Sequence, residues 1–153
     1  MSTINKEIKQ KTFESPQQEA VIALLLTADK LKSKLAELSL EFGITPQQYN
    51  VLRILNGSGP EGLPTLEVMN RMIEKNPGIT RLLKRITEKG LMERKRPSAD
   101  RRFQMCIITE DGKELLKKME EPIRTLTRNV MMYLHAEDIE QLLDLLFRAR
   151  KGM

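Results

Sequence analysis

Residues 76–109 have the sequence NPGITRLLKRITEKGLMERKRPSADRRFQMCIIT, and this stretch decides the fold of the chain. It predicts a short helix followed by a two-stranded hairpin with a basic tip. Asn76 is a favourable N-cap, Pro77 suits the first helical position, and Gly90 is placed to end the helix. Between these signals the apolar residues recur at helical spacing and form one face: Ile79, Leu82, Leu83 and Ile86.

The other side of this helix carries hydroxyl and cationic groups. At about 100° per residue, Thr80, Arg81 and Lys84 point away from the apolar face. Arg85 and Thr87 lie at its flanks. A helix buried on one side therefore presents polar and basic groups on the other.

Positive charge is concentrated in this part of the chain. Residues 71–102 hold eleven Lys and Arg against four acids, a net charge of +7. The whole chain carries only +5, so the remainder sums to −2. Localised charge on a helix and a hairpin tip indicates nucleic-acid binding. A solvated basic surface is the structural alternative, but cations on the outer face of a helix short enough to enter a groove weigh against it.

The predicted hairpin pairs residues 91–96 with residues 103–108, and the second segment alternates as a half-covered strand should. Asp100, Arg101 and Arg102 stand at its tip. A carboxylate next to a guanidinium can orient it through charge-assisted hydrogen bonds. An oriented arginine on a thin projection suits the minor groove, whose negative potential is deepest where it is narrow. A surface ion pair worth about 0–1 kcal/mol is the alternative.

Cap and breaker residues predict further helices before this stretch. A long helix is expected between Ser15 and Gly43, and a second from Thr45 to about Asn56. Residues 57–64 form a loop by composition. The second helix turns three side chains inward: Tyr49, Leu52 and Leu55.

A short helix capped by Thr65 is expected next, followed by a tight turn at residues 74–75. Together with the helix that follows, this is the helix-turn-helix pattern. The apolar side of the short helix is predicted to consist of Leu66, Met69 and Ile73.

Two helices are expected after the hairpin. Thr109 caps the first, and Pro122 inside it predicts a kink between Met119 and Pro122, because proline removes one backbone hydrogen bond. The last runs from about Ala136 to Lys151 and places four residues on one face: Ile139, Leu142, Leu143 and Leu146.

The long first helix and the last two helices carry more apolar surface than the chain itself can cover. A two-fold homodimer through these helices is the simplest solution. Two recognition helices related by a two-fold axis contact half-sites about 34–36 Å apart, one turn of DNA. We therefore expect a pseudo-palindromic site on double-stranded DNA.

The chain resembles the MarR family of transcriptional regulators, which are dimeric winged-helix repressors. Three motifs carry the resemblance: ITRLLKRITEKGLMER (79–94), DRR (100–102) and ITEDGKELL (108–116). The order of helices extends it from about Ser15 to the end. It implies a mainly α fold with a small β-hairpin wing, in which a winged helix-turn-helix lobe is joined to a helical dimerisation region.

Domain boundaries follow from the motifs and the helices around them. We expect a polar N-terminal lead over residues 1–14 and a winged-helix DNA-binding domain over residues 45–109. Residues 15–44 and 110–153 are expected to form the dimerisation region.

The resemblance also implies roles for individual residues. The second helix of the motif enters the major groove, and Thr80, Arg81 and Lys84 match its base-contacting and phosphate-contacting positions. The D-x-R pattern of the wing falls on Asp100 and Arg102, with Arg102 as the minor-groove arginine and Asp100 as its orienter. The predicted DNA-binding residues are Thr80, Arg81, Lys84, Arg85, Asp100, Arg101 and Arg102, of which Arg101 occupies the variable middle position of the wing motif.

No catalytic or metal site is predicted, and no cofactor. His135 precedes AEDIEQLL and suits a turn at a helix start, whereas a catalytic histidine or a zinc site needs several converging partners. Two interpretations of Cys106 stay open. It is most simply a small, partly buried side chain, but Arg94 or Arg96 would make it reactive by lowering its pKa.

Composition indicates a cytoplasmic protein. One cysteine cannot form an internal disulfide, and the start of the chain lacks the pattern of a secretory signal. The longest apolar run, residues 20–26, is too short to cross a membrane. Aromatic residues make up 4% of the chain and tryptophan is absent, which argues against base-stacking platforms for single strands.

These observations predict a sequence-specific regulator of transcription, a dimeric repressor released by a small molecule or another signal. For an effector, the resemblance implies a crevice between the dimer helices and the winged-helix lobe, lined by the first, second and fifth helices. Two alternatives remain: an architectural binder that contacts phosphates on any sequence, and a winged-helix module that binds an acidic protein.

Overall fold

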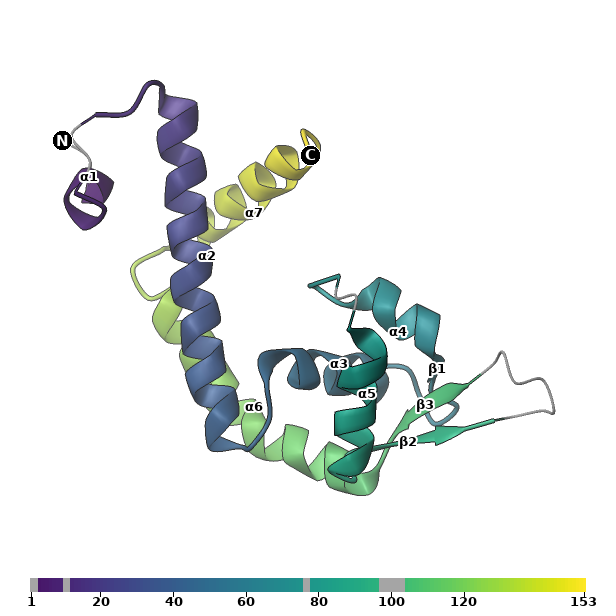
Figure 1. Ribbon diagram of the computed structural model, residues 1–153. Helices are drawn as coiled ribbons and strands as arrows, with labels where there is room; N and C mark the ends of the chain where they lie inside the picture. Colours follow the sequence, from purple (N-terminus) through teal and green to yellow (C-terminus); the bar gives the residue numbers. More distant parts are fainter. Residues whose placement is uncertain (1–2, 10–11, 76–77, 97–103) are drawn as a thin grey trace. The chain divides into compact units, whose positions relative to one another are not determined.

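The structure is a computed structural model that describes residues 3–9, 12–75, 78–96 and 104–153 (Figure 1). The chain divides into two compact units, residues 1–46 and residues 47–153, which we describe separately. The structure confirms the predicted fold class, which is mainly α with a small antiparallel sheet. The assignment of helices to a dimerisation region stays a prediction.

The first unit is built around one long helix, α2 (Pro16–Glu41). The Ser15 hydroxyl caps it by accepting a hydrogen bond from the Gln18 N–H at 3.2 Å, and Gly43 follows its end with φ +70°. Both predicted helix signals are thus confirmed. The polar lead also contains a short helix, α1 (Thr3–Glu7), and Glu7 forms an ion pair with Lys30 of α2 at 2.6 Å.

The helix-turn-helix of the second unit consists of α4 (Thr65–Arg71) and α5 (Ile79–Glu88), with α3 (Pro46–Asn56) before them. Leu52 and Leu55 of α3 are buried as predicted, and Tyr49 is half-buried. The largest fully buried side chains of these three helices include Val51, Leu52, Leu55, Val68, Leu83 and Ile86. The three helices therefore share one core.

The predicted apolar side of α4 is wrong. Leu66 and Ile73 are 63% and 85% exposed, whereas Val68 and Met72 are buried. The helix ends at Arg71 and Met72 adopts an extended conformation, so helical spacing cannot carry the side of Leu66 on to Ile73. Thr65 is the first helical residue rather than the cap, a position that Pro64 occupies without a side-chain hydrogen bond.

The wing is a three-stranded antiparallel sheet in the order β1-β3-β2. The predicted hairpin is present as β2 (Met92–Lys95) and β3 (Met105–Ile108), with Arg94 opposite Cys106. The third strand, β1 (Leu63–Pro64), falls in the segment that we expected to be a loop. It pairs with β3 through Leu63 opposite Cys106, so the sheet has a short proline-containing edge.

Helix α6 (Glu110–Val130) begins directly after β3. As predicted, the Thr109 hydroxyl caps it by accepting a hydrogen bond from the Gly112 N–H at 3.1 Å. The same hydroxyl donates to the Gly90 carbonyl oxygen at 2.6 Å. The start of α6 is thereby joined to the end of α5. The helix continues through Pro122, and the kink stays a prediction.

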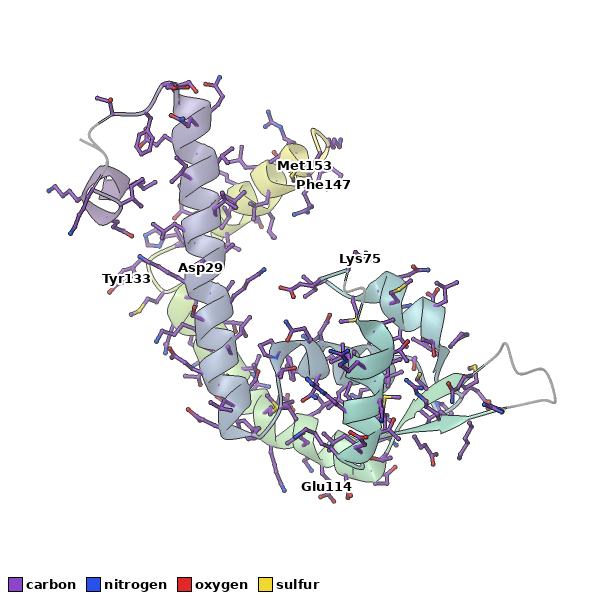
Figure 2. The ribbon with its side chains drawn as sticks, in the orientation of Figure 1. Asp29, Lys75, Glu114, Tyr133, Phe147 and Met153 are labelled. Atoms are coloured by element: carbon purple, nitrogen blue, oxygen red, sulfur yellow. The ribbon has the colours of Figure 1, made fainter. Side chains whose placement is uncertain are left out.

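The last helix is α7 (Ala136–Arg150). It ends within one residue of the predicted end at Lys151 and has no buried residue. Leu143, Leu145 and Phe147 are 63%, 55% and 52% exposed. Phe147 on α7 and Tyr133 in the turn before it are marked in Figure 2. This helix thus carries apolar side chains that the described residues leave exposed.

Candidate nucleic-acid interface

The inner face of α5 fixes this helix in the second unit. Leu83 and Ile86 are fully buried, Ile79 is 9% exposed and Leu82 is half-buried. The predicted apolar face is therefore confirmed. Because four side chains across two turns are packed, the helix has a defined rotation about its own axis.

The outer face of α5 presents the four residues predicted from the sequence. Thr80, Arg81, Lys84 and Arg85 are all exposed. Lys84 lies 3.7 Å from Glu88, a weak ion pair between two exposed side chains. Neither Arg81 nor Arg85 forms an ion pair with another described residue. Two guanidinium groups on this face are thus available for an anionic partner.

Glycine closes α5 as predicted. Gly90 has φ +70°, a conformation that costs glycine little. Its N–H donates to the Thr87 carbonyl at 2.9 Å, and the Leu91 N–H donates to the Ile86 carbonyl at 3.2 Å. These two bonds form a Schellman motif, which satisfies the last carbonyl groups and turns the chain into β2.

The helix begins later than the sequence suggested. Gly78 is at the N-cap and accepts a hydrogen bond from the Leu82 N–H at 3.0 Å. The predicted cap Asn76 and the predicted first helical residue Pro77 both lie outside the described residues. Gly78 has no side chain and therefore cannot itself cap this end of α5 through a side-chain hydrogen bond.

The predicted wing residues Asp100, Arg101 and Arg102 lie outside the described residues. At the described base of the wing, Arg94 is the cation that the sequence analysis considered only as a neighbour of Cys106. Arg94 donates from Nη1 to Oε1 of Gln104 on the neighbouring segment at 3.4 Å. Its Nε and Nη2 atoms are buried and have no hydrogen-bond partner among the described residues.

Cys106 is fully buried in the central strand of the sheet. Burial raises the pKa of its thiol, and this effect outweighs the hydrogen bond with Thr65 and the charge of Arg94, which act in the opposite direction. The thiol lies 3.7 Å from the Thr65 hydroxyl. The interpretation as a small packed side chain is therefore favoured over that of a reactive thiolate.

His135 has the structural position that the sequence predicted. It is the N-cap residue of α7, and its backbone N–H donates to Oδ2 of Asp138 at 2.8 Å. Across the described residues, no group of three or more His, Cys, Asp or Glu side chains is arranged to hold a metal ion. No helix of the described part is long and apolar enough to cross a bilayer.

Two polar side chains of α3 reach the turn between α4 and α5, and sequence analysis did not identify them. Asn50 accepts a hydrogen bond from the Ile73 N–H, and Gln47 donates one to Glu74. Their spacing of three residues on a helix was visible in the sequence. Their partners are 23 and 27 residues away, however, and no local pattern indicates such a contact.

The second unit has the three parts of a winged helix-turn-helix, which is a class of DNA-binding proteins. These parts are the short helix α4, the helix α5 with one buried face and one cationic face, and the hairpin of the sheet. The family model of the transcriptional regulators SarA and Rot matches residues 30–119. A MarR transcription factor from Planctomyces limnophilus is 36% identical, with a TM-score of 0.70 over 88% of this chain and 98% of that one. The chain belongs to the MarR and SarA family of winged-helix transcriptional regulators.

More distant relatives agree with this assignment. The HTH-type transcriptional regulator FarR of Neisseria gonorrhoeae is 26% identical over 102 residues, which are 67% of this chain and 68% of FarR. The fold is also that of MepR from S. aureus, solved in complex with DNA, with a TM-score of 0.79 and 20% identity over 87% of this chain and 97% of MepR. The protein is therefore a DNA-binding transcriptional regulator and not an enzyme.

Proposed function

We propose that this regulator is a dimeric repressor that binds a pseudo-palindromic site on double-stranded DNA in the cytoplasm. The observation that carries the proposal is the division of α5 into a buried apolar face and an exposed face with Thr80, Arg81, Lys84 and Arg85. In this proposal the exposed face enters the major groove. Arg81 is suited to base edges, because guanidinium groups pair with guanine in two-bond geometry.

The wing is the second contact in this proposal. Arg102 enters the minor groove, Asp100 orients it, and Arg101 adds positive charge next to the backbone. The register of β2 and β3 supports a projecting hairpin, since Lys95 lies opposite Met105 at the last described pair before the tip. Major-groove and minor-groove contacts on one side of the duplex then fix the position of each half of the dimer.

The open apolar surface of the terminal helices supports dimerisation. Residues 15–44 and 110–153 are the proposed dimerisation region. In α7 and the turn before it, Leu143, Phe147 and Tyr133 are 63%, 52% and 88% exposed. Large exposed apolar patches on a small protein mark association sites. A second copy supplies the same kind of surface through a two-fold axis.

Release of DNA by a small molecule completes the proposal. DNA binding by BpsR of Bordetella bronchiseptica, a structure of this fold, is regulated by 6-hydroxynicotinic acid. In this protein an effector would favour a dimer in which the recognition helices are wrongly spaced, which requires different affinities for two conformations. The second unit has a hollow of about 570 Å³ between α3, the outer side of the wing sheet and the start of α6. Helices α3 and α6 correspond to the second and fifth helices expected from the sequence, and these are two of the three helices expected to line the effector site.

Fluorescence anisotropy tests the proposal. The protein is titrated against the DNA upstream of its own coding sequence and against a scrambled duplex of equal length, at several salt concentrations. The expected result is a strong preference for the upstream duplex, with saturation at one dimer per site. Equal affinity for both duplexes, with a steep salt dependence, would instead favour an architectural binder. In that case site selection from random sequences decides whether any duplex is preferred.

A further inference from the structure

The turn between α4 and α5 is held by side chains of α3. Asn50 Oδ1 accepts a hydrogen bond from the Ile73 N–H at 3.0 Å, and Gln47 Nε2 donates to Glu74 Oε2 at 3.1 Å. Asn50, Gln47 and Glu74 are each half-buried, and the bond between Gln47 and Glu74 is partly buried, so water competes only partly for that bond. The donor of Gln47 and the acceptor of Asn50 lie about one helical turn apart on α3 and contact consecutive residues of the turn, Glu74 and Ile73.

The other described contacts of this turn differ along its length. The Met72 side chain is buried and its N–H bonds to the Met69 carbonyl at 3.3 Å, so the first residue of the turn is anchored. The Ile73 side chain, in contrast, is 85% exposed. Lys75, which Figure 2 labels at the end of the turn, is also exposed and donates a hydrogen bond back to the Asn70 carbonyl. The two contacts from α3 therefore connect the middle of the turn to a different helix.

The anchored end of these contacts is rigid. Val51, Leu52 and Leu55 of α3 are at most 1% exposed, which fixes the helix in the core. Helix α5 begins at Ile79, a few residues further along the chain, and is ten residues and about 15 Å long at 1.5 Å per residue. A tilt of about 10° at its start would move its far end by roughly 2.5 Å, several times the tolerance of a hydrogen bond to a base edge.

We propose that Gln47 and Asn50 are positioning residues that set the orientation of α5 and thereby its discrimination between DNA sequences. This inference depends on the proposed function of the exposed face of α5. Neither residue contacts DNA in this proposal. Their loss should therefore reduce the preference for one sequence while the number of phosphate contacts, and with it the salt dependence of binding, stays constant.

Charge at position 47 gives a test that separates positioning from helix stability. Gln47 is the second residue of α3, where an acid is favoured and a base disfavoured by the helix dipole. Gln47→Glu should thus stabilise α3 but place two carboxylates side by side at Glu74. Gln47→Lys should slightly destabilise α3 but keep a donor for Glu74. If Gln47 acts by positioning the turn, Gln47→Lys should keep more sequence preference than Gln47→Glu. If Gln47 acts only through the stability of α3, Gln47→Glu should keep more sequence preference than Gln47→Lys.

Asn50 offers a second matched pair. Asn50→Leu has the same branching at Cγ but no acceptor for the Ile73 N–H, whereas Asn50→Asp keeps an oxygen at the same place. Asn56→Asp at the other end of α3 is the control for Gln47→Glu, because it makes the same change of charge at an exposed position. Thermal unfolding by circular dichroism shows whether each variant is folded.

The experiment measures the ratio of dissociation constants for a scrambled duplex and a duplex selected from random sequences. Hydrogen exchange of the DNA-free protein is followed at the Ile73 amide. Gln47→Glu and Asn50→Leu should lower the ratio about tenfold, the equivalent of one base contact. Asn50→Leu should also speed hydrogen exchange at the Ile73 amide. The ratio should stay within about twofold of wild type in the three control variants, which are Gln47→Lys, Asn50→Asp and Asn56→Asp.

Two results would overturn the proposal. One is an unchanged ratio in folded Gln47→Glu and Asn50→Leu proteins. The other is an equal loss in Gln47→Lys and Gln47→Glu, which would mean that any substitution at this position is disruptive. If the wild type itself shows no preference in the selection, the proposed function fails and the role in discrimination fails with it. Exchange at Ile73 then still shows whether Asn50 holds the turn.

Discussion

Replacement of Gly112 by alanine should destabilise the protein, although alanine is the better helix former. A Cβ atom at this position would lie 2.3 Å from the Leu91 carbonyl oxygen and 2.7 Å from Cγ1 of Ile108. The Leu91 oxygen belongs to the backbone between α5 and β2, so it cannot rotate away as a side-chain atom would. The start of α6 would have to move by about 1 Å to restore ordinary contact.

Such a movement acts on the bonds that join α6 to the end of α5. The Thr109 N–H bonds to the Leu91 carbonyl at 3.1 Å and its hydroxyl bonds to the Gly90 carbonyl at 2.6 Å. Loss of both costs about 1–3 kcal/mol. Residual strain in a packed site costs about 1–3 kcal/mol more. Helix propensity returns about 1 kcal/mol, so the free energy of unfolding should fall by about 3 kcal/mol, within a range of about 1–5 kcal/mol.

Thermal unfolding of Gly112→Ala measures this effect. For a chain of this size, about 3 kcal/mol corresponds to a fall in Tm of about 6–12 °C. Gly57→Ala is the matched control, because the nearest atom to its Cβ would be 3.6 Å away. A Tm of Gly112→Ala equal to or above that of the wild type would refute the reasoning, since helix propensity alone predicts a rise.

Three further predictions follow from the site and the surface. Arg81→Ala should weaken binding to the preferred duplex by about 1–3 kcal/mol and relax sequence preference. Arg128→Ala, outside the basic region, should do neither. If Arg81→Ala weakens binding to all duplexes equally in anisotropy titrations, Arg81 contacts a phosphate instead. Leu143→Glu should raise the dissociation constant of the dimer at least a hundredfold, by about 3 kcal/mol, if α7 is buried in the dimer, whereas Gln141→Glu on the same helix serves as a control for charge in sedimentation experiments. Burial raises the pKa of Cys106 above the ordinary 9.0, so the unfolded chain loses its proton first. The free energy of unfolding should therefore fall more steeply above about pH 9 in the wild type than in Cys106→Ala. Urea titrations at a series of pH values measure this free energy, and the same pH dependence in both proteins would contradict the prediction.

Helix ends were predictable where one residue type carries the signal. Ser15 and Thr109 cap their helices through their own hydroxyls, and the conformation of Gly90 ends α5. The two faces of α5 followed from spacing alone, because the helix is long enough to show its period. The wing motif was recognised as well, although Asp100 and Arg102 lie outside the described residues.

Other features depend on contacts that a local pattern does not contain. The strand β1 has two residues and includes Pro64, so neither alternation nor composition indicated it; it exists because β3 offers a free edge. The prediction of the inner side of α4 was wrong because that helix stops before Met72. The contact between Asn50 and the Ile73 N–H joins residues 23 positions apart. In each case tertiary structure, not local preference, decides the outcome.

The separation of the two faces of α5 has a consequence for the engineering of new regulators. The side chains that hold the helix in the fold, Leu83 and Ile86 among them, are not the side chains proposed to contact bases. Thr80, Arg81 and Arg85 can therefore be varied in a library without a loss of core packing. Selection from such a library against chosen operators would yield regulators that act independently of one another in the same cell.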